Sequence, residues 1–371
     1  MKKVSKDKIM INDKKALYDK AIRLSQICNA CRYCEGFCAV FPAMEKRRDF
    51  DIKDMDYLAN LCHQCGECLY ACQYAPPHEF DITVARDFSA VRKESYKKFT
   101  TLKFLSSAFE KAGLVTAVLL LIVLAVFIGI TSGSFNKDVS GNFYEVTSYN
   151  TMVSLFGIFA LITLIVVVIS CVKFARSIGF SGVRFIDWMS ALKDALTLKN
   201  LGGHDYEGCT FPNGENRSNL RRYFHHFTFY GFLLCFIATC LAAFYDHILN
   251  YHAPYPFLSA PKLFGTIGGI SLLIGCAGLF VLKLKADPEL LDVKSLNVDY
   301  ALIFMLFLSA LTGLLLMLLR TTPVLSYILV LHLSTILSFF IIVPYSKMMH
   351  LFYRYLALVK NARECRLNTH N

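Results

Sequence analysis

Charged residues are scarce in this sequence of 371 residues. Asp, Glu, Lys and Arg make up 18% of it, whereas a soluble domain carries about 25%, so a purely soluble globule is disfavoured. Glycine and proline are also few, at 20 and 10 residues, and 55% of the chain is hydrophobic. This composition excludes collagen-like repeats and intrinsic disorder. Acidic residues number 28 against 39 basic ones, which leaves a formal net charge of +11.

The first 20 residues lack the apolar core of a secretory signal peptide, because charges recur every few positions. We therefore expect no signal peptide. The chain also lacks a Walker A run and a GxGxxG run followed by an acidic residue, so nucleotide binding is not expected. Of its 14 cysteines, eight fall between Cys28 and Cys72. This clustering predicts a reducing compartment, in which neighbouring thiolates bind metals.

Long apolar segments dominate the chain after residue 110. Each is about 20 residues long or longer, which lets a helix cross a hydrocarbon layer of about 30 Å. Six such segments contain no Asp, Glu, Lys or Arg: 112–131, 149–172, 223–245, 263–282, 300–319 and 324–346. We predict six transmembrane helices, since six buried core helices of this kind in one soluble chain are improbable.

Lysine and arginine gather in alternate connections, which sets the expected orientation. They are frequent in 173–222 and after the fourth and sixth spans, and rare in the other loops. The positive-inside rule then places both termini in the cytoplasm. We predict a cytoplasmic head at 1–100, a six-helix membrane domain at 101–350 and a basic tail at 351–371. Anionic lipid explains the positive charge better than nucleic acid does, so we expect a bilayer and no nucleic acid as partner.

The inner loop contains one further predicted helix. Apolar residues recur at helical spacing within 183–201, at Phe185, Met189, Leu192 and Leu196. Gly202 and Gly203 supply a C-terminal stop. We expect this helix to lie on the membrane surface or to pack under the head.

The clustered cysteines repeat one motif, C-x2-C-x2-C-x3-C, which is the spacing of the bacterial ferredoxin run that holds [4Fe–4S] clusters. Three thiolates at x2 intervals wrap one corner of a cluster, and the fourth reaches the other cluster. The expected sets are Cys28, Cys31, Cys34 and Cys72 for one cluster, and Cys62, Cys65, Cys68 and Cys38 for the other. Zinc is the alternative, although it rarely uses this run. Ferredoxins usually place proline after the fourth cysteine, where this chain has Ala39 and Gln73.

Histidines occur at both ends of the third and sixth predicted spans, and ionisable residues inside a membrane are functional candidates. They are His225, His226, His247, His332 and His350. His332 and His350 are 18 residues apart, so they share one helix face about 27 Å apart. Because the two spans are antiparallel, His225 or His226 should face His350 on the inner side, and His247 should face His332 on the outer side. Two such pairs suit two b-type haems. The alternatives are hydrogen-bonded packing histidines and, less suitably, zinc.

The sequence resembles the tricarballylate-utilisation protein B (citrate-utilisation protein B) family over nearly its whole length. Its last span is also similar to the last helix of respiratory nitrate reductase gamma subunits. The similar segments are Arg221-Arg222-Tyr-Phe-His225-His226-Phe-Thr-Phe-Tyr-Gly231-Phe, Ala253-Pro254-Tyr255-Pro256, Gly265-Thr-Ile-Gly268-Gly269 and His332-Leu with Pro344-Tyr345-Ser346-Lys347-Met-Met-His350.

This resemblance implies a mainly α protein, with a bacterial-ferredoxin-like double [4Fe–4S] domain before a six-helix transmembrane haem-binding bundle in the bacterial inner membrane. It further implies an oxidoreductase component that reoxidises the reduced FAD of a partner dehydrogenase in tricarballylate or citrate catabolism. Electrons would pass through two clusters and two b-type haems to membrane quinone. No residue for catalysis on an organic substrate is identifiable.

Two other functions remain open at this point. One is a subunit of a heterodisulfide-reductase-like or fumarate-reductase-like complex, in which quinol reduces a cytoplasmic acceptor. The other is an iron–sulfur sensor or scaffold with structural histidines. For the relay, we expect the flavoprotein to dock on the head. Lys46, Arg47 and Arg48 are candidates for attracting an acidic partner, with a solvated charge run as the alternative.

Overall fold

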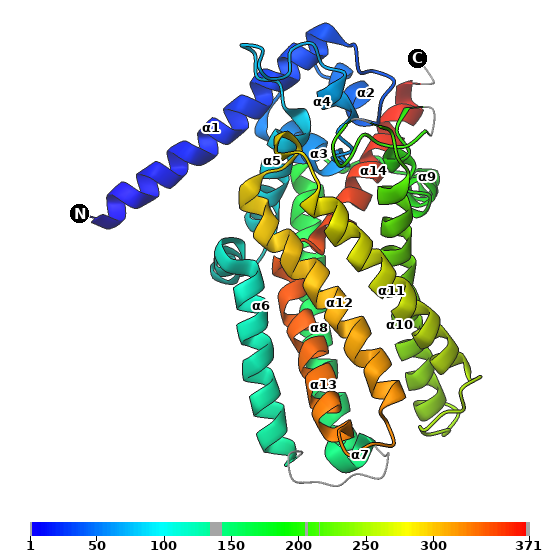
Figure 1. The fold of residues 1–371 in the computed structure, drawn as a ribbon. Helices are drawn as coiled ribbons and strands as arrows, with labels where there is room; N and C mark the ends of the chain where they lie inside the picture. Colours follow the sequence, from blue (N-terminus) through cyan, green and yellow to red (C-terminus); the bar gives the residue numbers. More distant parts are fainter. Residues whose placement is uncertain (1, 134–142, 205–206, 215, 369–371) are drawn as a thin grey trace.

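A small helical head stands on a bundle of long helices (Figure 1). The structure is a computed structural model that describes residues 2–133, 143–204, 207–214 and 216–368, with the backbone alone for 2–12. The head helices are α1 (Lys2–Cys31), α2 (Val40–Glu45), α3 (Ile52–Leu61), α4 (Glu67–Tyr70) and α5 (Val84–Phe99). The described residues form no strand, and Cys209 and Ser218 make one isolated antiparallel bridge. The predicted mainly α fold is confirmed.

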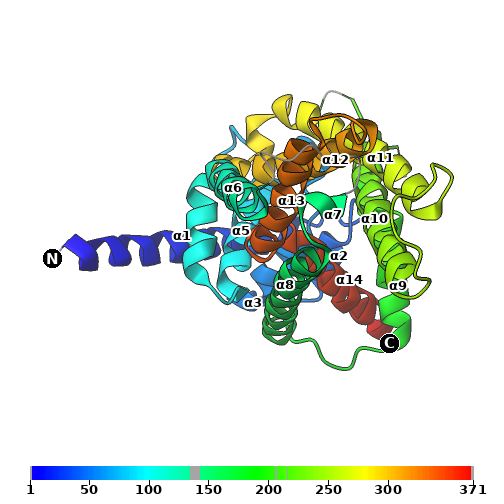
Figure 2. The same ribbon diagram turned by 90° about the horizontal axis from the view of Figure 1, so that it is seen from below.

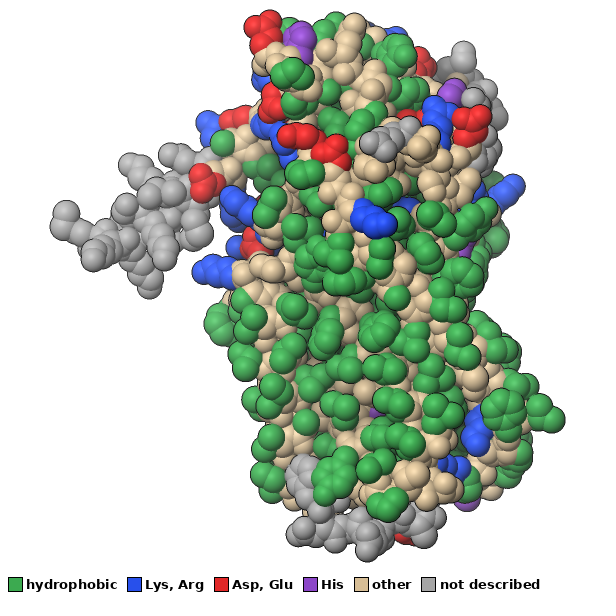
Figure 3. All heavy atoms as spheres, in the orientation of Figure 1, with side chains coloured by type: hydrophobic (Ala, Val, Ile, Leu, Met, Phe, Trp, Pro, Cys, Tyr) green, Lys and Arg blue, Asp and Glu red, His purple; other side chains and the backbone are tan. Residues whose placement is uncertain are grey.

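Within the described residues, six helices form the bundle, and all are long and apolar enough to cross a membrane, as predicted. They are α6 (Lys103–Ser132), α8 (Tyr149–Ser177), α10 (Leu220–His247), α11 (Ala260–Leu284), α12 (Leu296–Leu318) and α13 (Leu325–Ile342). Hydrophobic side chains cover most of the bundle surface, while charged ones gather mainly around the head (Figure 3). This distribution is compatible with a multi-pass membrane protein. The short α7 (Phe143–Val146) lies at the far end of the bundle.

A break interrupts α6 near its start, where Ala112 has non-helical backbone angles, φ −146° and ψ 52°. The charged first turns of α6, which include Glu110 and Lys111, therefore run separately from the apolar part. Residue 112, from which the sequence predicts the first span, is the residue at this break.

Glycine brings α10 and α11 into backbone contact. A Cβ atom on Gly268 would lie 2.8 Å from the backbone nitrogen of Cys235, and one on Gly231 would lie 2.6 Å from that of Leu272. Gly275 approaches Thr228 in the same way, at 2.5 Å from its backbone nitrogen. Small residues permit this approach in membranes, where dispersion contacts rather than burial from water hold helices together.

The two helices stand together on one flank of the bundle, opposite α6 (Figure 2). Among the described helices, α10 packs extensively on α11 alone. The rest of the surface of α10 therefore faces the side of the bundle that holds the sixth span and the helix after it.

The sixth span continues through a short 3₁₀ turn, Val343–Tyr345, into α14 (Met349–Asn368), which runs up beneath the head and packs on α3. The sequence predicted a basic tail at 351–371, but the part up to Asn368 is a helix integrated with the head. Arg47 fixes this contact, because its guanidinium pairs with Asp54 at 2.6 Å and with Glu364 of α14 at 2.8 Å. Nearer the start of α14, the ring of Tyr353 stacks on that of Phe174 of α8, with centroids 4.5 Å apart.

The amphipathic helix predicted within 183–201 is confirmed as α9 (Phe185–Leu196), which packs on α14. Asp187 accepts two hydrogen bonds from Arg366 of α14, both at 2.8 Å, and Arg366 holds the pKa of that carboxyl below its usual value. The apolar residues on its other face are exposed: Phe185, Ile186, Met189 and Leu192. An exposed apolar face beside the bundle suits the membrane interface.

We predict that Gly268→Leu destabilises the bundle by about 1–3 kcal/mol, because the new side chain forces α10 and α11 apart. The measurement is the thermal unfolding midpoint of the detergent-purified protein. Gly157→Leu is the matched control, since a Cβ atom on Gly157 of α8 would have no other atom within 4 Å. Equal midpoints for the two variants would contradict the close packing of α10 and α11.

Candidate cofactor sites in the head and the bundle

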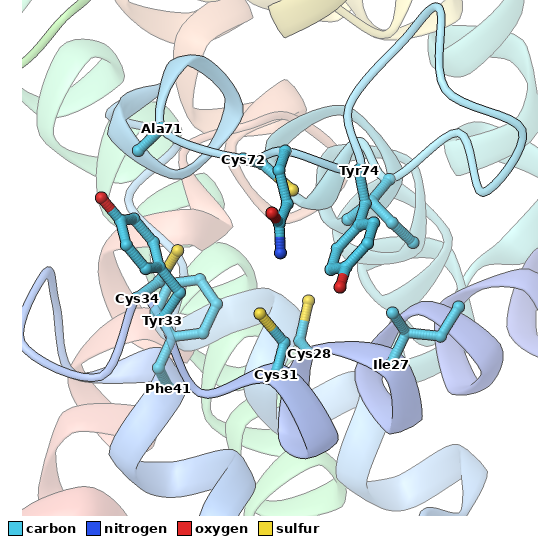
Figure 4. Close-up of a pocket in the computed structure, with 11 residues that line it drawn as sticks. Ile27, Cys28, Cys31, Tyr33, Cys34, Phe41, Ala71, Cys72 and Tyr74 are labelled. Carbon is cyan, nitrogen blue, oxygen red and sulfur yellow. The ribbon is translucent and has the colours of Figure 1, made fainter.

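Four thiols from both cysteine motifs surround a cavity of about 240 Å³ in the head. Cys28 and Cys31 stand on the last turn of α1, Cys34 lies in the turn that follows, and Cys72 comes just after α4. Their sulfur atoms point toward a common space (Figure 4). The structure therefore brings together the set that the spacing predicted, three cysteines of the first motif and the last of the second.

This first cavity opens to the surface of the head. Cys31 is exposed, and Tyr33 beside it is 68% exposed. Tyr74 and Ile27 add apolar lining. Burial, reinforced by the neighbouring thiols, raises the pKa of Cys28 to about 12. Thiolates grouped in this way need a strong local positive charge, such as that of bound iron.

The other four motif cysteines line a second cavity, deeper in the molecule and smaller, at about 20 Å³. They are Cys38, Cys62, Cys65 and Cys68. The loop between α3 and α4 carries two of them and turns sharply, with left-handed backbone at Gln64 (φ 55°) and at Gly66 (φ 90°). The Gln64 side chain donates to the carbonyl of Leu290, in the connection between α11 and α12, at 2.7 Å. This set also matches the prediction.

The thiols enclose cavities and do not converge on a point. Among the described residues, no group of three or more His, Cys, Asp or Glu side chains is placed to hold a single metal ion. Tetrahedral zinc needs four donors, each about 2.0–2.3 Å from one centre. A four-iron cluster is held instead at separate corners, one thiolate each. Two sets of four thiols around two cavities therefore fit clusters better than zinc ions.

Two predicted histidines face each other at the head end of the bundle. The rings of His225 on α10 and His350 on α14 have centroids 6.3 Å apart and are inclined at 77°. Nδ1 of His350 lies 2.5 Å from the carbonyl of Lys347, so it donates there and leaves Nε2 as the basic nitrogen. Nδ1 of His225 is buried and has no hydrogen-bond partner in the part of the chain that the structure describes. Imidazoles bind metals at about 2.0 Å, so two rings across one ion stand about 6 Å apart.

The neighbouring His226 points elsewhere. Its ring lies 5.7 Å from that of Tyr230, whose hydroxyl donates to the carbonyl of Leu196 at the end of α9. The sequence left His225 and His226 as alternatives, and the structure places only His225 opposite His350.

The outer pair is not brought together. Nδ1 of His332 lies 2.9 Å from the hydroxyl of Thr312 on α12, which itself donates to the carbonyl of Leu308 at 2.7 Å. His247 is exposed at the end of α10 and lies 2.9 Å from the hydroxyl of Tyr149. In the part of the chain that the structure describes, the two histidine rings make no contact. The outer pair stays a prediction.

Three arginines next to these sites, of which Arg92 is buried and the other two are half-buried, were not predicted from the sequence. Arg221 lies four residues before His225 on α10, and Arg354 lies four residues after His350 on α14. Both donate to the loop of the second cavity, as does Arg92 of α5. The sequence does show that Arg221 and Arg354 each lie four residues from a histidine. That spacing alone does not indicate what the two arginines contact.

Comparison with known proteins is consistent across the chain. The family model described as Citrate utilization protein B matches residues 106–370. The model of the Citrate utilization protein B Fer4-like domain matches residues 21–98. Citrate utilization protein B of Escherichia coli is 40% identical over 348 residues, which are 93% of this chain and 92% of that protein.

No solved structure matches the chain. The two family models together extend from α1 to the end of α14, and therefore include both cysteine motifs and all five histidines discussed above. The identity to the relative covers almost all of both proteins. By both measures, the chain belongs to the citrate utilization protein B family.

Proposed function

We propose that this protein relays electrons between a reduced flavoprotein dehydrogenase and membrane quinone. The observation that carries the proposal is the division of eight motif thiols into two sets of four around two cavities, with one cysteine exchanged between the motifs. The second cavity lies next to the facing histidines, because the helices that carry them also contact its loop. Family membership and the Fer4-like head support electron transfer in citrate utilisation.

The cysteine sets are proposed to hold two [4Fe–4S] clusters, which supply one-electron transfer when bound. Cys28, Cys31, Cys34 and Cys72 would hold the first, and Cys38, Cys62, Cys65 and Cys68 the second.

His225 and His350 are proposed to hold one b-type haem. The buried, unpartnered nitrogen of His225 and the oriented ring of His350 are the supporting observations. A second haem on His247 and His332 has no such support, because those side chains contact different neighbours.

The dehydrogenase is proposed to dock over the first cavity, since electron transfer needs a short gap and this cavity opens beside exposed Cys31 and Tyr33. Arg47 is not available to attract a partner, because it is nearly buried in ion pairs with Asp54 and Glu364. That part of the charge-steering hypothesis is wrong. Arg48 is exposed and still fits it.

The cluster assignment predicts that Cys28→Ser and Cys65→Ser each remove or convert a different cluster, because the two cysteines line different cavities. The measurement is electron paramagnetic resonance of the anaerobically purified, reduced protein, with iron and acid-labile sulfide analysis. Cys240→Ser is the control, since Cys240 is exposed outside both motifs. Unchanged spectra for Cys28→Ser and Cys65→Ser would contradict the assignment.

The haem assignment predicts that His225→Ala and His350→Ala each lose one haem, while His226→Ala retains it. Haem content per chain and the reduced-minus-oxidised α-band measure this, and cluster content checks folding. Retention of all haem in His225→Ala would refute the inner pair. If the wild-type protein holds two haems and His332→Ala loses one, the outer site is real despite the hydrogen bond between His332 and Thr312.

The relay itself predicts that the protein in quinone-containing liposomes oxidises the reduced dehydrogenase, with quinol formed in equal amount. Stopped-flow absorbance follows both changes. The alternative function, in which quinol reduces a cytoplasmic acceptor, predicts net transfer in the other direction. A wild-type protein without a b-haem band would favour the sensor or scaffold instead.

A further inference from the structure

Three guanidinium groups converge on the loop that carries Cys62 and Cys65. Arg92 and Arg354 both donate to the carbonyl of Cys62, at 2.8 and 2.9 Å. Arg221 donates to the carbonyl of Gln64 at 2.5 Å and to that of His63 at 3.2 Å. The three come from α5, α14 and α10, so the head, the sixth-span extension and the third span all meet at this loop.

These arginines have no carboxylate partner among the described residues, in contrast to Arg47, Arg86, Arg217 and Arg366, which all form ion pairs. Among the described residues, Nη2 of Arg92 and Nε of Arg354 are buried with no hydrogen-bond acceptor. A buried, unbalanced cation is costly, so such a group implies an anion beside it.

Asp299 does not supply that anion. Asp299 lies at the same junction, but it already pairs with Lys283 and, at 2.6 Å, with Lys347. These two lysines outweigh its single charge, so the junction stays positive.

The first cavity has no comparable group of cations, because its described lining residues include no charged side chain. The buried carboxylate of Glu67, on α4, pairs with Arg217 at 3.1 Å. At the second cavity, three guanidinium groups donate hydrogen bonds to the loop that carries Cys62 and Cys65. The two sets of thiols are alike in number but differ in their electrostatic surroundings.

We propose that Arg92, Arg221 and Arg354 are positioning residues that raise the reduction potential of the second cluster above that of the first. The inference rests on the proposed function, because it assumes a cluster in each cavity. A reduced cluster carries one more negative charge than the oxidised form, so buried cations favour its reduction.

With a cluster bound in each cavity, one electron would pass from the first, which is oxidised, to the second, which is reduced, and no proton would be transferred. Arg92, Arg221 and Arg354 would thereby favour transfer from the exposed first cavity inward, to the side where His225 and His350 face each other.

The test is a redox titration of the full-length, anaerobically purified protein, followed by electron paramagnetic resonance. The Cys28→Ser and Cys65→Ser spectra assign the two signals. In Arg354→Gln and Arg221→Gln, the reduced fraction of the second cluster at fixed ambient potential should fall about tenfold, while that of the first is unchanged. Arg354→Lys keeps the positive charge and should therefore keep most of the difference in reduction potential between the two clusters.

Arg86→Gln is the matched control, because Arg86 lies on the same helix as Arg92 but pairs with Glu289 at 2.5 Å. It should leave both potentials at their wild-type values. Intact clusters with unshifted potentials in both glutamine variants would overturn the inference. So would a shift in Arg354→Lys as large as that in Arg354→Gln. Loss of the second cluster in Arg354→Gln with wild-type behaviour in Arg354→Lys would support it. A wild-type protein without two cluster signals would refute the proposed function instead.

Discussion

The hydrogen bonds that Arg221 and Arg354 donate to the Cys62–Gln64 loop join the two halves of this molecule. Each arginine sits one helical turn from a histidine of the facing pair, so one set of contacts fixes both the loop and the spacing of α10 and α14. The carbonyls that accept these bonds would otherwise be buried without donors, which is costly. The orientation of the head on the bundle follows from this constraint.

The bundle is built unevenly around that joint. Close glycine contacts tie α10 to α11, while α10 packs only sparsely on the other helices. Because close packing against one neighbour fixes the position of a helix, its other side does not need to be closely packed. His225 projects from such a helix toward His350, and its buried nitrogen has no protein partner. A polar atom of this kind is expected where a ligand completes the structure.

The two cavities differ in the charged groups around them, although their cysteine motifs have the same spacing. The first opens to the surface and its described lining residues include no charged side chain, while three guanidinium groups donate to the loop of the second. This asymmetry arises from the surroundings of the motifs. The third span contributes Arg221, and α14, which follows the sixth span, contributes Arg354, so a head without these helices would lack most of the difference.

Sequence alone determined the six spans, the amphipathic helix at Phe185–Leu196 and the two cysteine sets, because those features depend on local periodicity and spacing. It did not separate His225 from His226, since adjacent residues on one helix differ only in direction, and packing against α14 and α9 decides that direction. It could not foresee that Arg47 would be buried against Glu364, which lies 317 residues away. Such contacts between distant segments depend on how whole helices pack, which residue spacing does not encode.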